Sequence, residues 1–422
     1  MSTTCGGGTA TMKLLTVLSL LAITLSVTES VMVCYYASWA TYRVRDGKFD
    51  VEDIDPNICT HVVYTFAGLG TDNKIEVLDP WNDLCANWGK CGYNRFTDLK
   101  KLNPKLITQL SVGGYNEGST SYSNMAADPA KTQTFVTSTV ELLKAHGFDG
   151  LDLIWEYPTQ RGGVPADREN FITLLGKLHE ALHASGMILT VAVAALKSTI
   201  DQAYDIPAMV DVVDLVNVMT YDLHGPWEKY THHQSTLYAY KDDHGDTLYL
   251  NQNFSINYWI DGGMPSTKLT LGMPLYGRCW TLDNPDQHGY NARASHPGKA
   301  GPLTQTEGMM GYNEICDFIN KDSWTVVVEE GCNEPYTYNM AYGNIWCSYE
   351  DHDSCVIKAN YAREKNLAGL MVWTIDTDDF HAECTTRHFD LTRTLAETFA
   401  GNETRRISQS MLESRIDGSN LR

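Results

Sequence analysis

Acidic side chains alternate along the segment 148–158, whose sequence is FDGLDLIWEYP. In an extended strand alternate side chains share a face, so Asp152, Ile154 and Glu156 point one way while the intervening apolar residues point the other. Carboxylates on an inward face are costly to bury and pack poorly, which favours a functional role for the two acids over a structural one. The apolar Ile154 between them raises the question of whether this site still performs chemistry.

The segment resembles the DxxDxDxE signature of glycoside hydrolase family 18, the family of chitinases and chitinase-like lectins. Asp149, Asp152 and Glu156 match the signature, whereas Ile154 stands where the family has its third aspartate. Further blocks follow in family order: VCYY at 33–36, LSVGG at 110–114, MTYD at 219–222, YGR at 276–278 and MVW at 371–373. The resemblance extends from about residue 31 to residue 395.

The resemblance implies substrate-assisted chemistry, because this family is an exception to the usual pair of enzyme carboxylates. The carbonyl oxygen of the substrate's N-acetyl group attacks the anomeric carbon. Glu156 is then the general acid, Tyr221 hydrogen-bonds the acetamide oxygen, and Asp222 lies beside it. The aspartate that Ile154 replaces accepts a hydrogen bond from the acetamide N–H. Asp152 does not take its place, since it lies roughly 13 Å from Glu156 along a strand that rises about 3.3 Å per residue.

Loss of one transition-state hydrogen bond typically costs about 3–4 kcal/mol, or about 10²–10³ in rate. An apolar neighbour should also raise the pKa of Glu156 and keep its carboxyl protonated. We therefore predict a protein that binds chitin or N-acetylglucosamine oligomers and hydrolyses them weakly or not at all. Two alternatives stay open. One is an active endochitinase that cleaves β-1,4-linked N-acetylglucosamine with retention, and the other is a growth-factor-like lectin that acts through protein partners.

The resemblance also implies which residues contact the sugar. Carbohydrate sites combine aromatic platforms with polar groups at their edges. The expected set is Tyr35, Trp39, Tyr115, Met219, Trp227, Arg278 and Trp373. Tyr115 stands where the family usually has Trp, so we expect an altered subsite there. Arg278 has a second interpretation, as a structural ion-pair partner for an inserted domain.

Eight short β-rich runs position these residues. They cover 31–38, 60–67, 106–112, 148–156, 188–194, 212–220, 268–275 and 368–375. Helical patterns such as 167–185 and 351–365 separate several of them, which indicates parallel strands with crossover helices. The pattern predicts an α/β fold, a (β/α)8 TIM barrel whose site lies at the carboxyl ends of the strands. The gap over 277–345 is too long for a loop and resembles the family's small α+β insertion domain between strands seven and eight.

The two ends of the chain differ from the expected barrel domain, 31–395. Met12-Lys13 and the apolar run 14–27 are typical of a signal peptide over 1–30, with Met12 as the start, which predicts secretion. Residues 396–422 form a polar tail for which we expect disorder or a frayed helix. A net charge of −20 argues against nucleic acid and anionic membranes as partners. We expect a monomer that needs no cofactor.

Ten cysteines remain when Cys5 is set aside, an even number that suits disulfides in an oxidising compartment. The resemblance implies two pairings, Cys34–Cys59 and Cys316–Cys384. Cys85 and Cys91 are close enough in sequence to bridge their own loop. We expect two further bridges, in a pairing that stays open, among Cys279, Cys332, Cys347 and Cys355.

Two other features complete the set of expected sites. We recognise no His or Cys cluster with zinc-like spacing, so we predict no metal site. The pair His232-His233 is interpreted as a solvated loop feature rather than as ligands. Sequons at Asn253 and Asn402 are compatible with N-glycosylation of a secreted protein.

Overall fold

The computed structural model describes Met1, residues 30–329 and residues 331–401. Within these residues, eight parallel strands close into a barrel in the order β1-β2-β4-β5-β6-β7-β8-β15, because β15 also pairs with β1. A short strand, β3 (Ile75–Val77), pairs antiparallel with β2. The predicted (β/α)8 TIM barrel is confirmed. Most of the predicted signal peptide and the tail from residue 402 onward lie outside the described residues.

Each predicted β-rich run overlaps one barrel strand. The strands are β1 (Val31–Ala37), β2 (His61–Leu69), β4 (Ile107–Gly113), β5 (Gly150–Ile154), β6 (Ile188–Ala194), β7 (Leu215–Met219), β8 (Leu269–Pro274) and β15 (Gly369–Trp373). β5 is shorter than the predicted run 148–156, because its pairing with β4 ends at Ile154. Glu156 therefore lies just beyond the carboxyl end of its strand.

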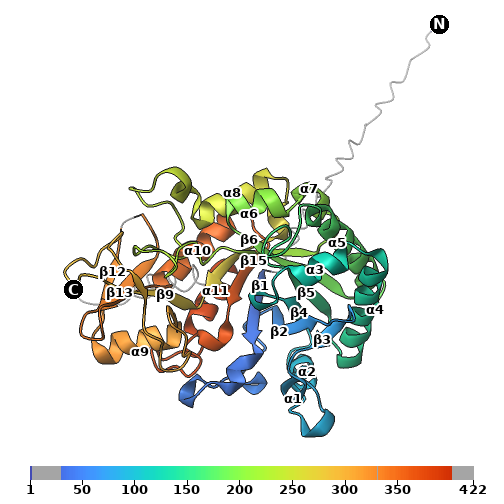
Figure 1. Ribbon diagram of the computed structural model, residues 1–422, viewed down its shortest axis with the longest axis horizontal. Coiled ribbons are helices and arrows are strands. Elements are labelled where there is room, and N and C mark those ends of the chain that lie inside the picture. The colour runs from blue at the N-terminus through green and yellow to red at the C-terminus, as the bar shows by residue number, and fades with distance from the viewer. Residues whose placement is uncertain (2–29, 330, 402–422) are drawn as a thin grey trace.

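Helices surround the barrel strands in Figure 1, and α9 lies beside a second sheet. The helices are α1 (Pro80–Asp83), α2 (Gly92–Thr97), α3 (Thr120–Ala126), α4 (Pro129–His146), α5 (Asp167–His183), α6 (Lys197–Ala203), α7 (Ile206–Met209), α8 (Gln252–Asp261), α9 (Tyr312–Asp322), α10 (His352–Glu364) and α11 (Asp390–Phe399). α11 runs past residue 396, where we expected the polar tail to begin, and the side chain of Phe399 is buried. In the residues that the structure describes, none of the helices combines the length and apolar character of a membrane span.

Alternation along the strands divides the core into two layers. In β1, Cys34 and Tyr36 pack in the large apolar cluster between the strands and the helices. Val33 and Tyr35 point the other way, into a smaller cluster inside the barrel that also contains Ile154. The period of two in a strand explains this division. The inner cluster forms the floor beneath the carboxyl ends of the strands.

A second, antiparallel sheet follows β8 and precedes β15. Its strands are β9 (Tyr276–Thr281), β10 (His296–Pro297), β11 (Met309–Gly311), β12 (Thr325–Val328), β13 (Pro335–Asn339) and β14 (Ile345–Ser348). They lie in the order β10-β9-β14-β13-β12, with β11 also paired to β9. Together with α9 this sheet lies to one side of the barrel (Figure 1). It occupies the place where the sequence suggested an α+β insertion.

Disulfide bridges tie several of these elements together. The structure contains the three expected pairs, Cys34–Cys59, Cys85–Cys91 and Cys316–Cys384, and a fourth, Cys279–Cys347. The fourth bridge joins directly opposed positions of β9 and β14. The expectation of a fifth bridge is wrong, because Cys332 and Cys355 are both buried free thiols. An even count of cysteines says nothing about which pairs lie within bonding distance.

Candidate active site

A cleft opens at the carboxyl ends of the barrel strands. One cavity of about 590 Å³ is lined by Tyr115, Ile154, Glu156, Tyr157, Ala195, Leu196, Met219, Tyr221, Asp222, Trp227, Tyr276, Arg278, Met309 and Trp373. A second cavity of about 510 Å³ shares Tyr115, Glu156 and Trp373 with the first and adds Trp39. The two cavities therefore lie on either side of Glu156, as an extended ligand that crosses the acid would need.

Asp152 lies at the bottom of this site and is completely buried. Its Oδ2 accepts hydrogen bonds from Tyr35 (2.8 Å) and Ser111 (3.2 Å). Its Oδ1 accepts them from Thr190 (2.6 Å) and Asn217 (3.4 Å). Burial raises the pKa of Asp152, although these donors act in the opposite direction. The carboxylate is thus held by neutral groups of the barrel interior.

Ile154 separates Asp152 from Glu156. Its side chain is 1% exposed and belongs to the inner apolar cluster with Tyr35 and Tyr221. The backbone of Ile154 is packed closely against β4. A Cβ on Gly113 would stand 2.1 Å from the carbonyl oxygen of Ile154, and Gly113 has a φ of +106°. Because Gly113 has no Cβ, the end of β4 can pack directly against the backbone of Ile154, and this contact constrains the position of residue 154.

Glu156 lines both cavities just beyond β5. Burial raises the pKa of Glu156 to about 7, and the negative charge of Asp222 acts in the same direction. A hydrogen bond with the Tyr157 side chain and the positive charge of Arg161 act against this rise. The direction agrees with the expectation from sequence, and a large share of the carboxyl is protonated near neutral pH. A protonated carboxyl in a cleft can act as a general acid.

Asp222 is held by the second sheet. Arg278 of β9 binds both of its oxygens at 2.6 Å, and the Tyr276 hydroxyl donates to Oδ1 at 2.7 Å. The guanidinium of Arg278 also lies 5.4 Å from the ring centroid of Trp227. Arg278 therefore pairs with a carboxylate that follows β7, as its structural interpretation implies, and it also lines the cleft, so that contact with a sugar stays a prediction. The insertion positions one side of the site through this pair.

Aromatic residues cover the remaining walls. The Tyr221 hydroxyl points into the inner cluster, 3.8 Å from the sulfur of Met371. Trp373 contacts Tyr35 at a ring-centroid distance of 5.3 Å. Trp227 is 60% exposed and Trp39 is 44% exposed, so both side chains are accessible where they line the cleft. Tyr35 is fully buried and supports the floor through its bond to Asp152, rather than forming an open platform.

Sequence reasoning missed several residues at this site, including Tyr157, Leu196 and Met309 of the first cavity and two residues that contact the aromatic walls. Phe66 of β2 lies parallel to Trp39 at 5.9 Å and also contacts Trp373. Arg161 stacks over the ring of Tyr115 at 3.8 Å from its centroid. No signal in the sequence indicated Arg161, which lies in the loop after β5. The aromatic Phe66 could have been considered, because it stands within the second β-rich run.

Comparisons with known proteins identify this architecture. The sequence model of glycosyl hydrolases family 18 matches residues 31–378. The chain belongs to that family. The chain is 40% identical over 367 residues to "Probable chitinase 2" of Drosophila melanogaster, covering 84% of this chain and 74% of that protein. This family 18 chain is also 40% identical to the Group IV chitinase of Ostrinia furnacalis, whose crystal structure matches with a TM-score of 0.84 over 88% of this chain and 100% of that one.

A third family 18 relative differs in activity. Human YKL-39 is described as a pseudo-chitinase with retained chitooligosaccharide binding properties. Its structure matches with a TM-score of 0.80 and 33% identity, over 87% of this chain and 99% of that chain. The family therefore includes relatives named as chitinases and one named as a pseudo-chitinase, so membership alone does not decide whether this chain cuts its ligand.

The histidines depart from two expectations. His232 and His233 are 9% and 1% exposed, so their interpretation as a solvated loop pair is wrong. The His232 ring bonds to Asp243 at 3.1 Å, and His233 lies close to Glu329 and Cys332. Glu329 and Cys332 come from a distant part of the chain, and no local sequence pattern indicates that they lie beside His233. The statement that no histidine cluster has zinc-like spacing is also wrong, because residues 179–183 read HEALH on α5.

The structure describes one of the two sequons. Asn253 lies near the start of α8 and is partly buried. Its Oδ1 accepts hydrogen bonds from Tyr361 at 3.1 Å and from Asn257 at 2.8 Å. Asn402 lies outside the described residues. Glycosylation at either site stays a prediction.

Proposed function

We propose that this protein binds chitin or N-acetylglucosamine oligomers in the cleft and hydrolyses them weakly or not at all. One observation carries the proposal: the position between Asp152 and Glu156 holds a buried isoleucine in a cleft that otherwise retains its acid and its aromatic walls. YKL-39 supports it as a relative with the same combination of properties. Relatives with allosamidin or chitooligosaccharides bound support the class of ligand.

Different residues of the cleft would perform different parts of the reaction. Aromatic rings at Trp39, Trp227 and Trp373 would stack on the apolar faces of successive sugars. Glu156 would donate its proton to the leaving oxygen, as its raised pKa allows. Tyr221 would bind the acetamide oxygen that attacks the anomeric carbon. These steps need only groups that the chain retains.

The missing step concerns the acetamide nitrogen. As the acetamide oxygen attacks, positive charge develops on the oxazolinium, and a carboxylate at position 154 would accept the N–H and balance that charge. Ile154 has no acceptor. Asp152 is turned toward Tyr35, Ser111 and Thr190. Loss of this stabilisation would lower the rate by about 10²–10³ or more, while the stacking interactions that dominate binding are left in place.

Active hydrolysis is the second candidate, and the protonated state of Glu156 favours it. Calorimetric titration with a chitin oligomer, followed by chromatographic analysis of the same sample for shorter products, separates the two candidates. Binding with little or no product supports our proposal. Turnover at the rate of an active chitinase establishes the second candidate, and a failure to bind contradicts both.

Secretion is part of the same proposal. The apolar segment 14–27, the disulfide bridges and the chitinase relatives all suit a protein that acts outside the cell. We propose that the mature chain begins at residue 31 and acts as a monomer, with a folded domain that runs through α11 to Phe399 rather than ending at residue 395. Mass spectrometry of the protein released by eukaryotic cells would test the start at residue 31, because an intact segment 1–30 would contradict the cleavage that we expect.

A further inference from the structure

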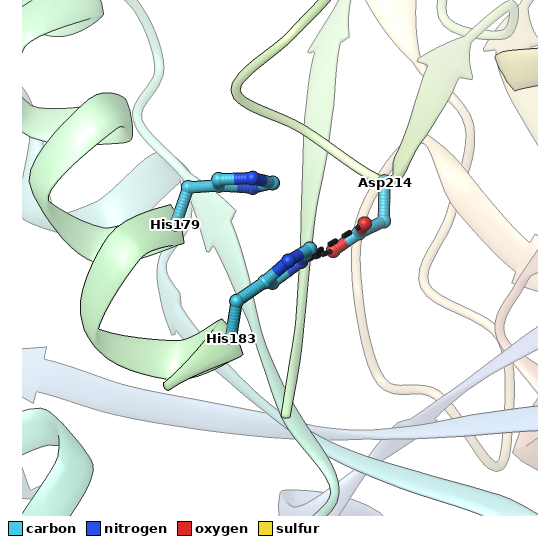
Figure 2. A group of neighbouring side chains, drawn as sticks. All are labelled: His179, His183 and Asp214. Atoms are coloured by element: carbon cyan, nitrogen blue, oxygen red, sulfur yellow. Dashed lines mark hydrogen bonds and ion pairs between the residues drawn. The ribbon is translucent and has the colours of Figure 1, made fainter. Parts of the chain in front are cut away.

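A group of three potential metal ligands lies at the end of the barrel opposite the cleft. His179 and His183 are four residues apart on α5, and Asp214 immediately precedes β7 (Figure 2). Because Asp214 stands at the amino end of its strand and His183 at the end of the helix that leads to β6, the group lies far from the carboxyl ends that form the cleft. It plays no part in the sugar chemistry described above.

The helix places the two histidines on one face. Residues i and i+4 of an α-helix are neighbours on its surface. The buried side chains of Leu178 and Leu182 precede the two histidines by one position each, so His179 and His183 lie at the edge of the buried stripe. Their ring centroids are 3.8 Å apart. Figure 2 shows both rings projecting from α5 toward Asp214.

Asp214 is held in place by the neighbouring strand. Its Oδ2 accepts the backbone N–H of Leu189 at 2.8 Å, and its own backbone N–H donates to the carbonyl of Leu189 at 2.9 Å. Both carboxylate oxygens bond to Nε2 of His183, at 3.1 and 2.9 Å. A carboxylate anchored by a backbone donor has the kind of outer support that metal-binding carboxylates need.

The ring of His179 carries a buried nitrogen without a partner in the part of the chain that the structure describes. Nδ1 of His179 is buried, and among the described residues it has no hydrogen-bond partner. Buried polar atoms in proteins are normally satisfied, so this atom calls for a partner.

We propose that His179, His183 and Asp214 bind one divalent transition-metal ion of the zinc class. One donor atom from each residue lies within 4.8 Å of the others. In a tetrahedral zinc site with bonds of about 2.1 Å the donors are about 3.4 Å apart, so small side-chain rotations suffice to close the site. Two imidazoles and one carboxylate suit zinc rather than magnesium, which prefers oxygen ligands.

With three protein ligands, a water molecule would complete the tetrahedron, and the place of the site far from the cleft assigns it to stability rather than to the sugar chemistry. The segment HEALH has the H-E-x-x-H spacing that binds zinc in metalloproteases, where the glutamate is the general base. Here Glu180 is exposed, and the third ligand comes from the start of β7. A metal ion in this position would join α5 to the β6–β7 edge of the barrel. It would stabilise the folded chain by binding to it in preference to the unfolded chain.

Thermal denaturation of chelator-treated protein tests the site. We expect one equivalent of Zn²⁺ to raise the melting midpoint, and Mg²⁺ at the same concentration to leave it unchanged. His179→Ala should remove the shift with little change in the metal-free midpoint, because the imidazole of His179 makes no hydrogen bond among the described residues. Asp214→Asn should weaken zinc binding at least tenfold, although it also weakens the contact with His183, because the amide keeps one acceptor oxygen but no charge.

Two control variants separate this site from adventitious binding to surface histidines. His146→Ala removes a histidine at the end of α4, and Glu180→Ala removes the neighbouring exposed carboxylate, so both should keep the full zinc shift. Replacement of zinc by Co²⁺ should give the visible absorption of tetrahedral cobalt in wild type but not in His179→Ala. The proposal is overturned by an absent zinc shift in wild type, or by equal shifts in wild type and His179→Ala.

Discussion

Replacement of Ile154 by aspartate should convert this protein into a much better chitinase. The side chain of residue 154 faces the barrel interior between Asp152 and Glu156, and adjacent inward positions of a strand are about 6.6 Å apart. A carboxylate there can accept the acetamide N–H and stabilise the developing positive charge. One such interaction contributes about 3–4 kcal/mol to transition-state stability, so kcat/KM should rise by about 10²–10³.

The same substitution should lower the stability of the fold. Ile154 is almost completely buried in the inner cluster, and truncation of a buried aliphatic side chain typically costs about 2–5 kcal/mol. A new carboxylate beside Asp152 adds charge repulsion, which one shared proton would relieve. We expect Ile154→Asp to have a lower melting midpoint and a higher rate than wild type. An increase in the fraction of folded protein could not explain this result, because it would raise both quantities.

Chromatographic measurement of products from a defined chitin oligomer, at equal concentrations of folded protein, provides the assay. Ile154→Asn matches aspartate in volume but carries no charge, so its rate should stay at least tenfold below that of Ile154→Asp. Ile154→Ala opens the same space without an acceptor and should gain nothing. Equal turnover by wild type and Ile154→Asp would refute the reasoning, because residue 154 would then not limit the chemistry.

Three further predictions concern the cleft and the cysteines. Trp373→Ala should weaken binding of a chitin oligomer about tenfold in calorimetry, because base-of-cleft stacking is lost, whereas Trp88→Ala, at a residue that is 96% exposed and outside both cavities, should change nothing. Because burial raises the pKa of Glu156 to about 7, the acid form is present below that pH and lost above it. Any hydrolysis should therefore fall as pH rises through about 7, and Glu156→Gln should remove it at every pH while binding persists; a rate that rises with pH would contradict this role. A thiol reagent should label two groups per chain in protein lacking residues 1–30, Cys332 and Cys355, and only after denaturation, whereas a fifth bridge would leave none.

The sequence by itself determined the barrel fold of this protein. Strand-forming runs separated by helical patterns specify a barrel, because each element must bury its own apolar face and parallel strands require crossovers. The alternation around Ile154 indicated which side chains face the interior, and the structure places them on that face. These inferences need only the local sequence, because the alternation of side chains in a strand is set by adjacent residues.

Tertiary structure alone decided which distant groups meet. The pair between Arg278 and Asp222 joins residues 56 positions apart. The free thiol of Cys332 could not be foreseen from an even number of cysteines, because bond formation depends on distance in space. The histidine spacing on α5 was visible in the sequence, but only the fold brings Asp214 to it. Periodicity is a local property of the chain, whereas ion pairs, bridges and ligand sets depend on how the elements pack.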